Sequence, residues 1–131
     1  MSAERRVERQ AREVVRRMRK ALRREGVGAA FAELVRPLGV VAHDPDAAAE
    51  YRRAVTRDDP LAFALLYARH HLRSSADDRV TLSEVHLAWV EAARDWLEPA
   101  VEPYAYRRAE VAPRETGKST WWFLILPLWA A

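Results

Sequence analysis

The chain contains no cysteine, so it can form neither a disulfide nor a metal site with thiolate ligands. Its longest apolar run is the stretch of eleven residues from 121 to 131, whereas a membrane-spanning helix needs about 20. The N-terminus is rich in arginine and lacks the apolar segment of a signal peptide. There is no internal repeat and no low-complexity tract. These absences favour a globular or helical protein with no membrane partner.

The formal net charge of +3 is unevenly distributed along the chain. Residues 1–25 contain ten Arg/Lys and four Asp/Glu, giving +6, and the other 106 residues contain twelve and fifteen, giving −3. Within 3–24, apolar residues recur every three or four positions, which predicts a helix with one narrow apolar stripe. Its arginines could bind DNA phosphates, form a solvated face interleaved with glutamates, or pack against a neighbouring subunit.

Capping and stop signals predict further helices along the next part of the chain. The expected spans are 29–35, ended by Pro37 and Gly39; 46–56, after an Asp-Pro pair; 61–72, after a second Asp-Pro pair; and 82–97, opened by a Thr81–Glu84 capping box. A polar loop is expected at 74–79. This much of the chain therefore reads as mainly helical.

The C-terminal part has a different pattern. The pattern at 104–111 predicts a strand, the one convincing strand of the chain, and an apolar helix is expected from 120 to about 126, disturbed by Pro127. Between them, residues 112–120 read APRETGKST, which matches the phosphate-binding loop G-x-x-x-x-G-K-[ST] except that Ala112 replaces the first glycine. Gly117 would let the backbone curl around an anion, and the following helix would point its N-terminus at the phosphates.

The run VAPRETGKSTWW at 111–122 resembles the ATPase motor of phage terminase large subunits, in which a loop of the form (A/G)-P-R-x-x-G-K-S-T is common. Two further segments are also similar to that family. They are the apolar sequence at 122–130 and the segment 83–87, which places a histidine on an apolar helix. The resemblance covers about residues 80–131. It implies a mainly α lead-in over residues 1–98, followed over residues 99–131 by the first strand–loop–helix of a P-loop NTPase α/β domain, incomplete in this chain. We therefore expect the chain to be the N-terminal piece of a longer protein.

The resemblance also implies a nucleotide site for ATP and Mg²⁺. Lys118 would bind the β- and γ-phosphates, Ser119 would hold the Mg²⁺ that accompanies ATP, and Arg114 would sense the γ-phosphate. Thr120 would lie near the α-phosphate and His86 near the adenine. The implied nucleotide-binding residues are Pro113, Arg114, Glu115, Thr116, Gly117, Lys118, Ser119, Thr120 and His86.

By the same resemblance, the whole protein would hydrolyse ATP to pump viral DNA into a procapsid and would cut DNA with a separate nuclease domain. Its partners would be double-stranded DNA, the portal, the small terminase subunit and other copies of itself in a homo-oligomeric ring, in the cytoplasm of the host cell during phage assembly. No strand ending in Asp-Glu follows the loop in this chain, so no catalytic residue is expected in it and it should be inactive alone.

Other interpretations stay open. The chain could be a small helical module that binds DNA or a protein partner through helix 3–24, or a fragment of another P-loop ATPase, such as a helicase or a partitioning protein. His86 could be a helix histidine whose hydrogen bonds are satisfied locally. His70 and His71 are poor metal ligands, because adjacent helix positions point in different directions.

Overall fold

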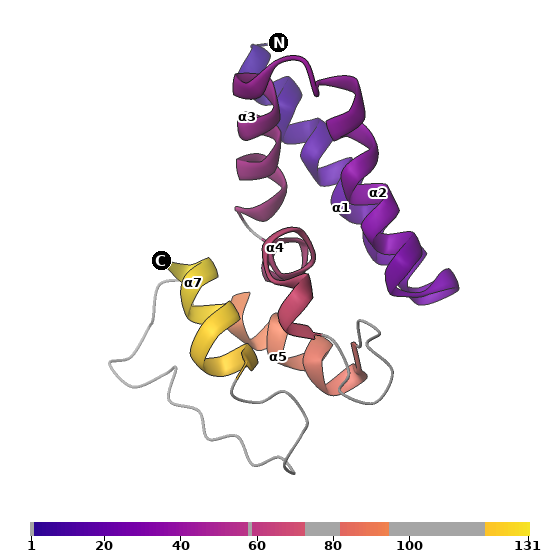
Figure 1. The fold of residues 1–131 in the computed structure, drawn as a ribbon, viewed down its shortest axis with the longest axis vertical. Helices are drawn as coiled ribbons and strands as arrows, with labels where there is room; N and C mark the ends of the chain where they lie inside the picture. Colours follow the sequence, from indigo (N-terminus) through magenta and orange to yellow (C-terminus); the bar gives the residue numbers. More distant parts are fainter. Residues whose placement is uncertain (1, 58, 73–81, 95–119) are drawn as a thin grey trace.

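The computed structural model describes residues 2–57, 59–72, 82–94 and 120–131 (Figure 1). All regular elements among these residues are helices. They are α1 (Ala3–Glu25), α2 (Val27–Val40), α3 (Pro45–Thr56), α4 (Pro60–Tyr67), the 3-10 turn η1 (Arg69–Leu72), α5 (Glu84–Arg94), the π-helical turn η3 (Trp121–Ile125) and α7 (Leu126–Ala130). None of the helices in these ranges is both long and apolar enough to cross a bilayer.

Two helices begin at the Asp-Pro pairs that the sequence indicated. Asp44 accepts the backbone N–H groups of Asp46 and Ala47, both at 3.1 Å, and so caps α3. Asp59 caps α4 in the same manner. In each case the proline that follows occupies the first helical position, where its missing N–H costs nothing.

Helix α2 is longer than predicted. It runs through Pro37 to Val40 instead of ending before the proline. A proline inside a helix removes one hydrogen bond and costs about 3 kcal/mol. Leu34 is fully buried on one side of Pro37, and Leu38 packs against the core on the other, so their burial offsets this cost.

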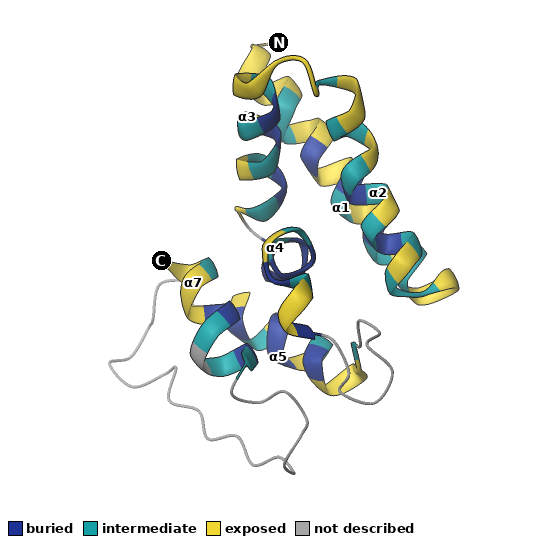
Figure 2. Cartoon of the chain, viewed as in Figure 1, coloured by how far each residue is buried: buried dark blue, intermediate teal, exposed yellow. Residues whose placement is uncertain are grey.

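Helix α4 lies at the centre of the molecule, where it contacts α2, α3, α5, η3 and α7 (Figure 1). Its sequence PLAFALLY is apolar on all sides, which is typical of a helix surrounded by other helices. Leu61, Ala62, Ala64 and Leu65 have no exposed surface, and Figure 2 shows α4 dark blue on most of its circumference. Helices α1, α2 and α3 pack on one side of it, and α5 and the C-terminal helix pack on the other.

The C-terminal helix, formed by η3 and α7, belongs to this helical core. Trp121, Ile125 and Leu126 have no exposed surface, and the helix contacts α4. It continues past Pro127, whereas the sequence suggested a disturbance there. The preceding turn is π-helical, with the N–H of Leu126 bonded to the carbonyl of Trp121. A widened turn of this kind relieves the clash between a proline ring and the carbonyl four residues earlier.

The prediction of an α/β P-loop domain is therefore wrong for the part of the chain that the structure describes, which contains no strand. Among the described residues, the helix after the phosphate-loop motif contacts α4 and α5, and no strand lies against it. The physical reason is that apolar burial is non-directional, so helices can cover an apolar helix side as well as strands can. The strand predicted at 104–111 and the loop predicted at 112–119 lie outside the described residues.

Tyr51 on α3 gives a pH test of the packing between α2 and α3. Its hydroxyl donates a hydrogen bond of 2.6 Å to the carbonyl of Leu34. Burial disfavours the phenolate and, against a smaller opposing effect of Arg17, raises the pKa of Tyr51 to about 12. The unfolded chain loses this proton near pH 10, so the stability is complete below about pH 10 and falls as the pH rises toward 12.

Tyr51→Phe is expected to lower the free energy of unfolding by about 1 kcal/mol at neutral pH, because the hydrogen bond is lost. Between about pH 10 and 12 the variant should lose less stability than the parent, since it has no phenol to titrate at this position. Urea midpoints measured at about pH 8 and about pH 11 test both points. Equal declines in the two proteins would show that Tyr51 titrates alike in the folded and unfolded chains.

Candidate functional site

The candidate nucleotide site lies around the start of the C-terminal helix. Thr120 is the first described residue there, is half-buried and has helical backbone angles. It directly follows the Gly117-Lys118-Ser119 sequence. Residues 113–119, which include most of the predicted nucleotide contacts, lie outside the described residues. Of the predicted set, the structure therefore places Thr120 and His86.

His86 is held by its own helix. The backbone N–H of Ser83 donates to Nδ1 of His86 at 3.2 Å, and the backbone N–H of His86 donates to Oγ of Ser83 at 3.4 Å. The two residues thus cap the start of α5 reciprocally, as in a capping box. A neutral ring with an accepting Nδ1 has its proton on Nε2. Thr81 of the predicted capping box lies outside the described residues, and the described helix begins at Glu84, after this cap.

The structure brings His86 next to the residue that follows Thr120. The imidazole stacks on the indole of Trp121, with ring centroids 5.5 Å apart and an interplanar angle of 24°. Trp89 lies 5.4 Å from the same imidazole and makes an edge-on contact with Trp122 at 6.0 Å. The four rings join α5 to the C-terminal helix. His86 is buried and makes hydrogen bonds within its own helix, which agrees with its interpretation as a helix histidine that is satisfied locally. The contact of His86 with adenine stays a prediction.

The C-terminal helix is fixed at both ends. At its start, Trp121 is buried against His86. At its end, Nε1 of Trp129 donates a hydrogen bond of 2.8 Å to the carbonyl of Thr56, the last residue of α3. The backbone at Thr120 is already helical, and the contacts of Trp121 and Trp129 hold the described part of this helix in place against α5 and α3.

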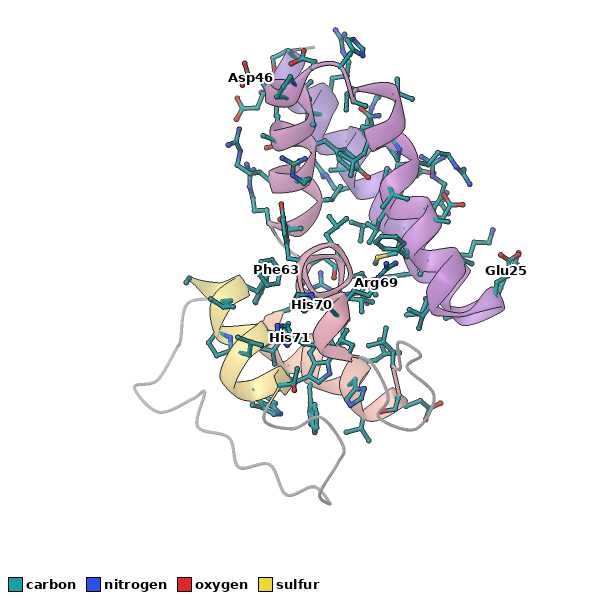
Figure 3. All side chains as sticks on the ribbon, in the orientation of Figure 1. Glu25, Asp46, Phe63, Arg69, His70 and His71 are labelled. Atoms are coloured by element: carbon teal, nitrogen blue, oxygen red, sulfur yellow. The ribbon has the colours of Figure 1, made fainter. Side chains whose placement is uncertain are left out.

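The histidine pair at 70 and 71 was predicted to diverge, and that prediction is wrong. Both residues lie in the 3-10 turn η1, and their ring centroids are only 4.0 Å apart (Figure 3). The part of the chain that the structure describes nevertheless holds no group of three His, Cys, Asp or Glu residues able to bind a metal. Arg69 beside them stacks its guanidinium on Phe31, 3.7 Å from the ring centroid, and so links η1 to α2.

Sequence reasoning missed two features of this site. The first is the reciprocal cap between Ser83 and His86, which the spacing of three residues could have indicated. The second is the contact of His86 with Trp121, which lies 35 positions later in the sequence. No local pattern encodes that pairing, because it depends on how the C-terminal helix docks on α5.

Comparison of the chain with models of protein families, with curated proteins and with solved structures found no match. Two features of the chain bear on its function: the loop motif that precedes the C-terminal helix, and the charge carried by α1.

Proposed function

We propose that the chain is the ATP-binding, N-terminal segment of an ATP-driven DNA-packaging motor of the phage terminase large-subunit class. The observation that supports this most is the APRETGKST motif, which leads directly into a helical segment that is anchored in the core through Trp121. Glycine, lysine and serine in this order, ahead of a helix, are the combination that binds nucleotide phosphates.

Each motif residue has a separate part in the proposal. Gly117 permits the backbone conformation in which successive N–H groups face an anion. Lys118 neutralises charge on the β- and γ-phosphates, and the Ser119 hydroxyl ligates the Mg²⁺ that arrives with ATP. Arg114 interacts with the γ-phosphate. A Mg²⁺ ion held by Ser119 would supply the further positive charge that phosphoryl transfer requires.

In this proposal the chain binds ATP and does not hydrolyse it. The sixteen residues after Glu115 contain no carboxylate side chain, so none of them can complete the Mg²⁺ site or orient an attacking water. Hydrolysis then requires carboxylates from outside this segment. Double-stranded DNA is the polymer that the motor moves, and further copies of the chain, a portal and a small subunit are its protein partners.

Lys118→Ala is expected to weaken the binding of MgATP to this chain by about 10- to 100-fold. This corresponds to the roughly 1.5–3 kcal/mol of a hydrogen bond to a charged group, which the alanine cannot form with the phosphates. Isothermal titration calorimetry of MgATP into the parent and the variant measures the change.

Lys20→Ala is the matched control, because Lys20 is the other lysine of the chain and is exposed on α1. It should leave MgATP binding unchanged. If the two variants bind MgATP equally, or if the parent binds none, residues 112–120 are not a phosphate-binding loop. ADP release measured in the same samples should stay at the background rate.

A further inference from the structure

Helix α1 carries a continuous row of cations on the side that faces away from the core. The row recurs at spacings of three and four residues, so its members share one helix face. All six side chains are exposed, and we call them the basic stripe: Arg5, Arg9, Arg12, Arg16, Lys20 and Arg23. The opposite face holds Ala11, Val14 and Met18, which are buried against the other helices.

The acidic residues of α1 neutralise only part of this stripe. Glu8 pairs with Arg57, the residue after α3, at 3.4 Å and with Arg12 at 3.9 Å. Glu13 pairs with Arg16 at 2.7 Å. Among the described residues, none of the remaining stripe cations has an acidic partner within ion-pair distance; these are Arg5, Arg9, Lys20 and Arg23. The stripe therefore retains a strong positive potential.

The dimensions of the stripe suit a nucleic-acid backbone. With a rise of 1.5 Å per residue, positions 5 to 23 span about 27 Å, and successive cations lie about 4.5–6 Å apart along the axis. Each strand of a duplex carries one phosphate per about 3.4 Å of axis, so several phosphates of one strand can meet the stripe together. Five of the six cations are arginines, whose planar guanidinium groups match phosphate oxygens in pairs.

We propose that the basic stripe of α1 binds the phosphate backbone of double-stranded nucleic acid. Helix α1 contains no aromatic residue, whereas proteins that hold single strands stack the bases on aromatic side chains. It is also unsuited to enter a membrane surface, because its apolar face is already buried within the protein. The inference rests on the proposed function in that double-stranded DNA is already a partner of the motor, and it names the surface of this chain that binds it. It does not depend on the phosphate-loop motif, so it stands or fails separately from ATP binding.

The test is fluorescence anisotropy of a labelled DNA duplex of about 20 base pairs, without nucleotide, at salt concentrations of about 50 to 200 mM. The triple variant Arg9→Ala, Lys20→Ala and Arg23→Ala should bind at least about tenfold more weakly, because three phosphate contacts are lost. The slope of log affinity against log salt should become shallower by about one for each cation removed. Alanine has a higher helix propensity than arginine or lysine, so α1 should stay folded.

The matched control removes the same net charge from three exposed cations on other helices, namely Arg36 of α2, Arg53 of α3 and Arg94 of α5. This triple alanine variant should keep the affinity and the salt slope of the parent. Equal weakening in the two triple variants would show that net charge and not the stripe is responsible. Tighter binding to a single strand or to vesicles containing phosphatidylserine than to the duplex would also overturn the proposal. Absence of any duplex binding at low salt would do the same.

Discussion

Replacing Trp121 with alanine is expected to lower the free energy of unfolding by about 3–5 kcal/mol, the usual cost of removing a fully buried tryptophan from a core. Trp121 has no exposed surface, and its indole stacks on His86. The truncation would leave a cavity between α5 and the C-terminal helix. Since a small protein is stable by only about 5–15 kcal/mol, the variant should lose a large part of its stability.

Urea unfolding followed by far-ultraviolet circular dichroism measures this effect without using the fluorescence of the deleted indole. Leu128→Ala is the control in the same helix, because the Leu128 side chain is 57% exposed. It should cost less than about 0.5 kcal/mol. Equal losses in the two variants would mean that the C-terminal helix does not pack in the core as described.

The sequence was sufficient to predict features that depend on neighbouring residues. The apolar spacing in 3–24 predicted α1 to within one residue at its end. The Asp44-Pro45 and Asp59-Pro60 pairs predicted the starts of α3 and α4, because an aspartate cap and a proline at the first helical position act within one turn. Caps and first-turn prolines can be predicted from the sequence because they involve residues within one helical turn of each other.

Features that depend on distant residues were predicted less well. The apolar sequence at 121–131 is compatible with burial under either strands or helices. The sequence alone therefore could not show that α4 and α5 pack against it. The continuation of α2 through Pro37 depends on burial of Leu34 and Leu38, which no local stop signal reports. Tertiary packing overrides local preference in both cases.

In the candidate site, too, features that depend on adjacent residues could be predicted, and features that depend on distant residues could not. The motif predicts Lys118 and Ser119 as phosphate and Mg²⁺ contacts from residue type and order alone, because phosphate binding uses backbone and side-chain groups that are adjacent in the chain. Both residues lie outside the described part of the structure, so this stays a prediction. His86 was selected from its position on an apolar helix. Its hydrogen bonds with Ser83 and its contact with Trp121 were not predicted, since the second of these requires two helices to dock.

Asp59 and Arg19 together link α1, α4 and α5, and Asp59 is expected to be the most sensitive charged position of the core. It is buried, caps α4 through the N–H groups of Leu61 and Ala62, and accepts two hydrogen bonds from the guanidinium of Arg19, at 3.1 and 3.2 Å. Arg19 also donates to Glu91 of α5 at 2.8 Å. Burial alone would lower the pKa of Arg19, but the two carboxylates outweigh it and the pKa is raised.

Asp59→Ala is expected to cost about 3 kcal/mol, because it removes a helix cap and also leaves a largely buried arginine with only one partner. Asp44→Ala removes the same kind of cap from α3 at an exposed position and should cost only about 1 kcal/mol. Urea unfolding of both variants separates the cap from the ion pair, because the two positions share the Asp-Pro sequence and differ in burial.

A double-mutant cycle then isolates the pairing itself. Arg19→Met keeps much of the apolar stem and removes the charge, so Asp59→Ala should cost less in the Arg19→Met background than in the parent. A coupling energy of about 1 kcal/mol or more would show that the pair links α1 to α4. If the effects are simply additive, Asp59 acts only as a cap. The attachment of α1 to α4 then depends on the apolar residues that the two helices contribute to the core, Met18 and Leu61 among them.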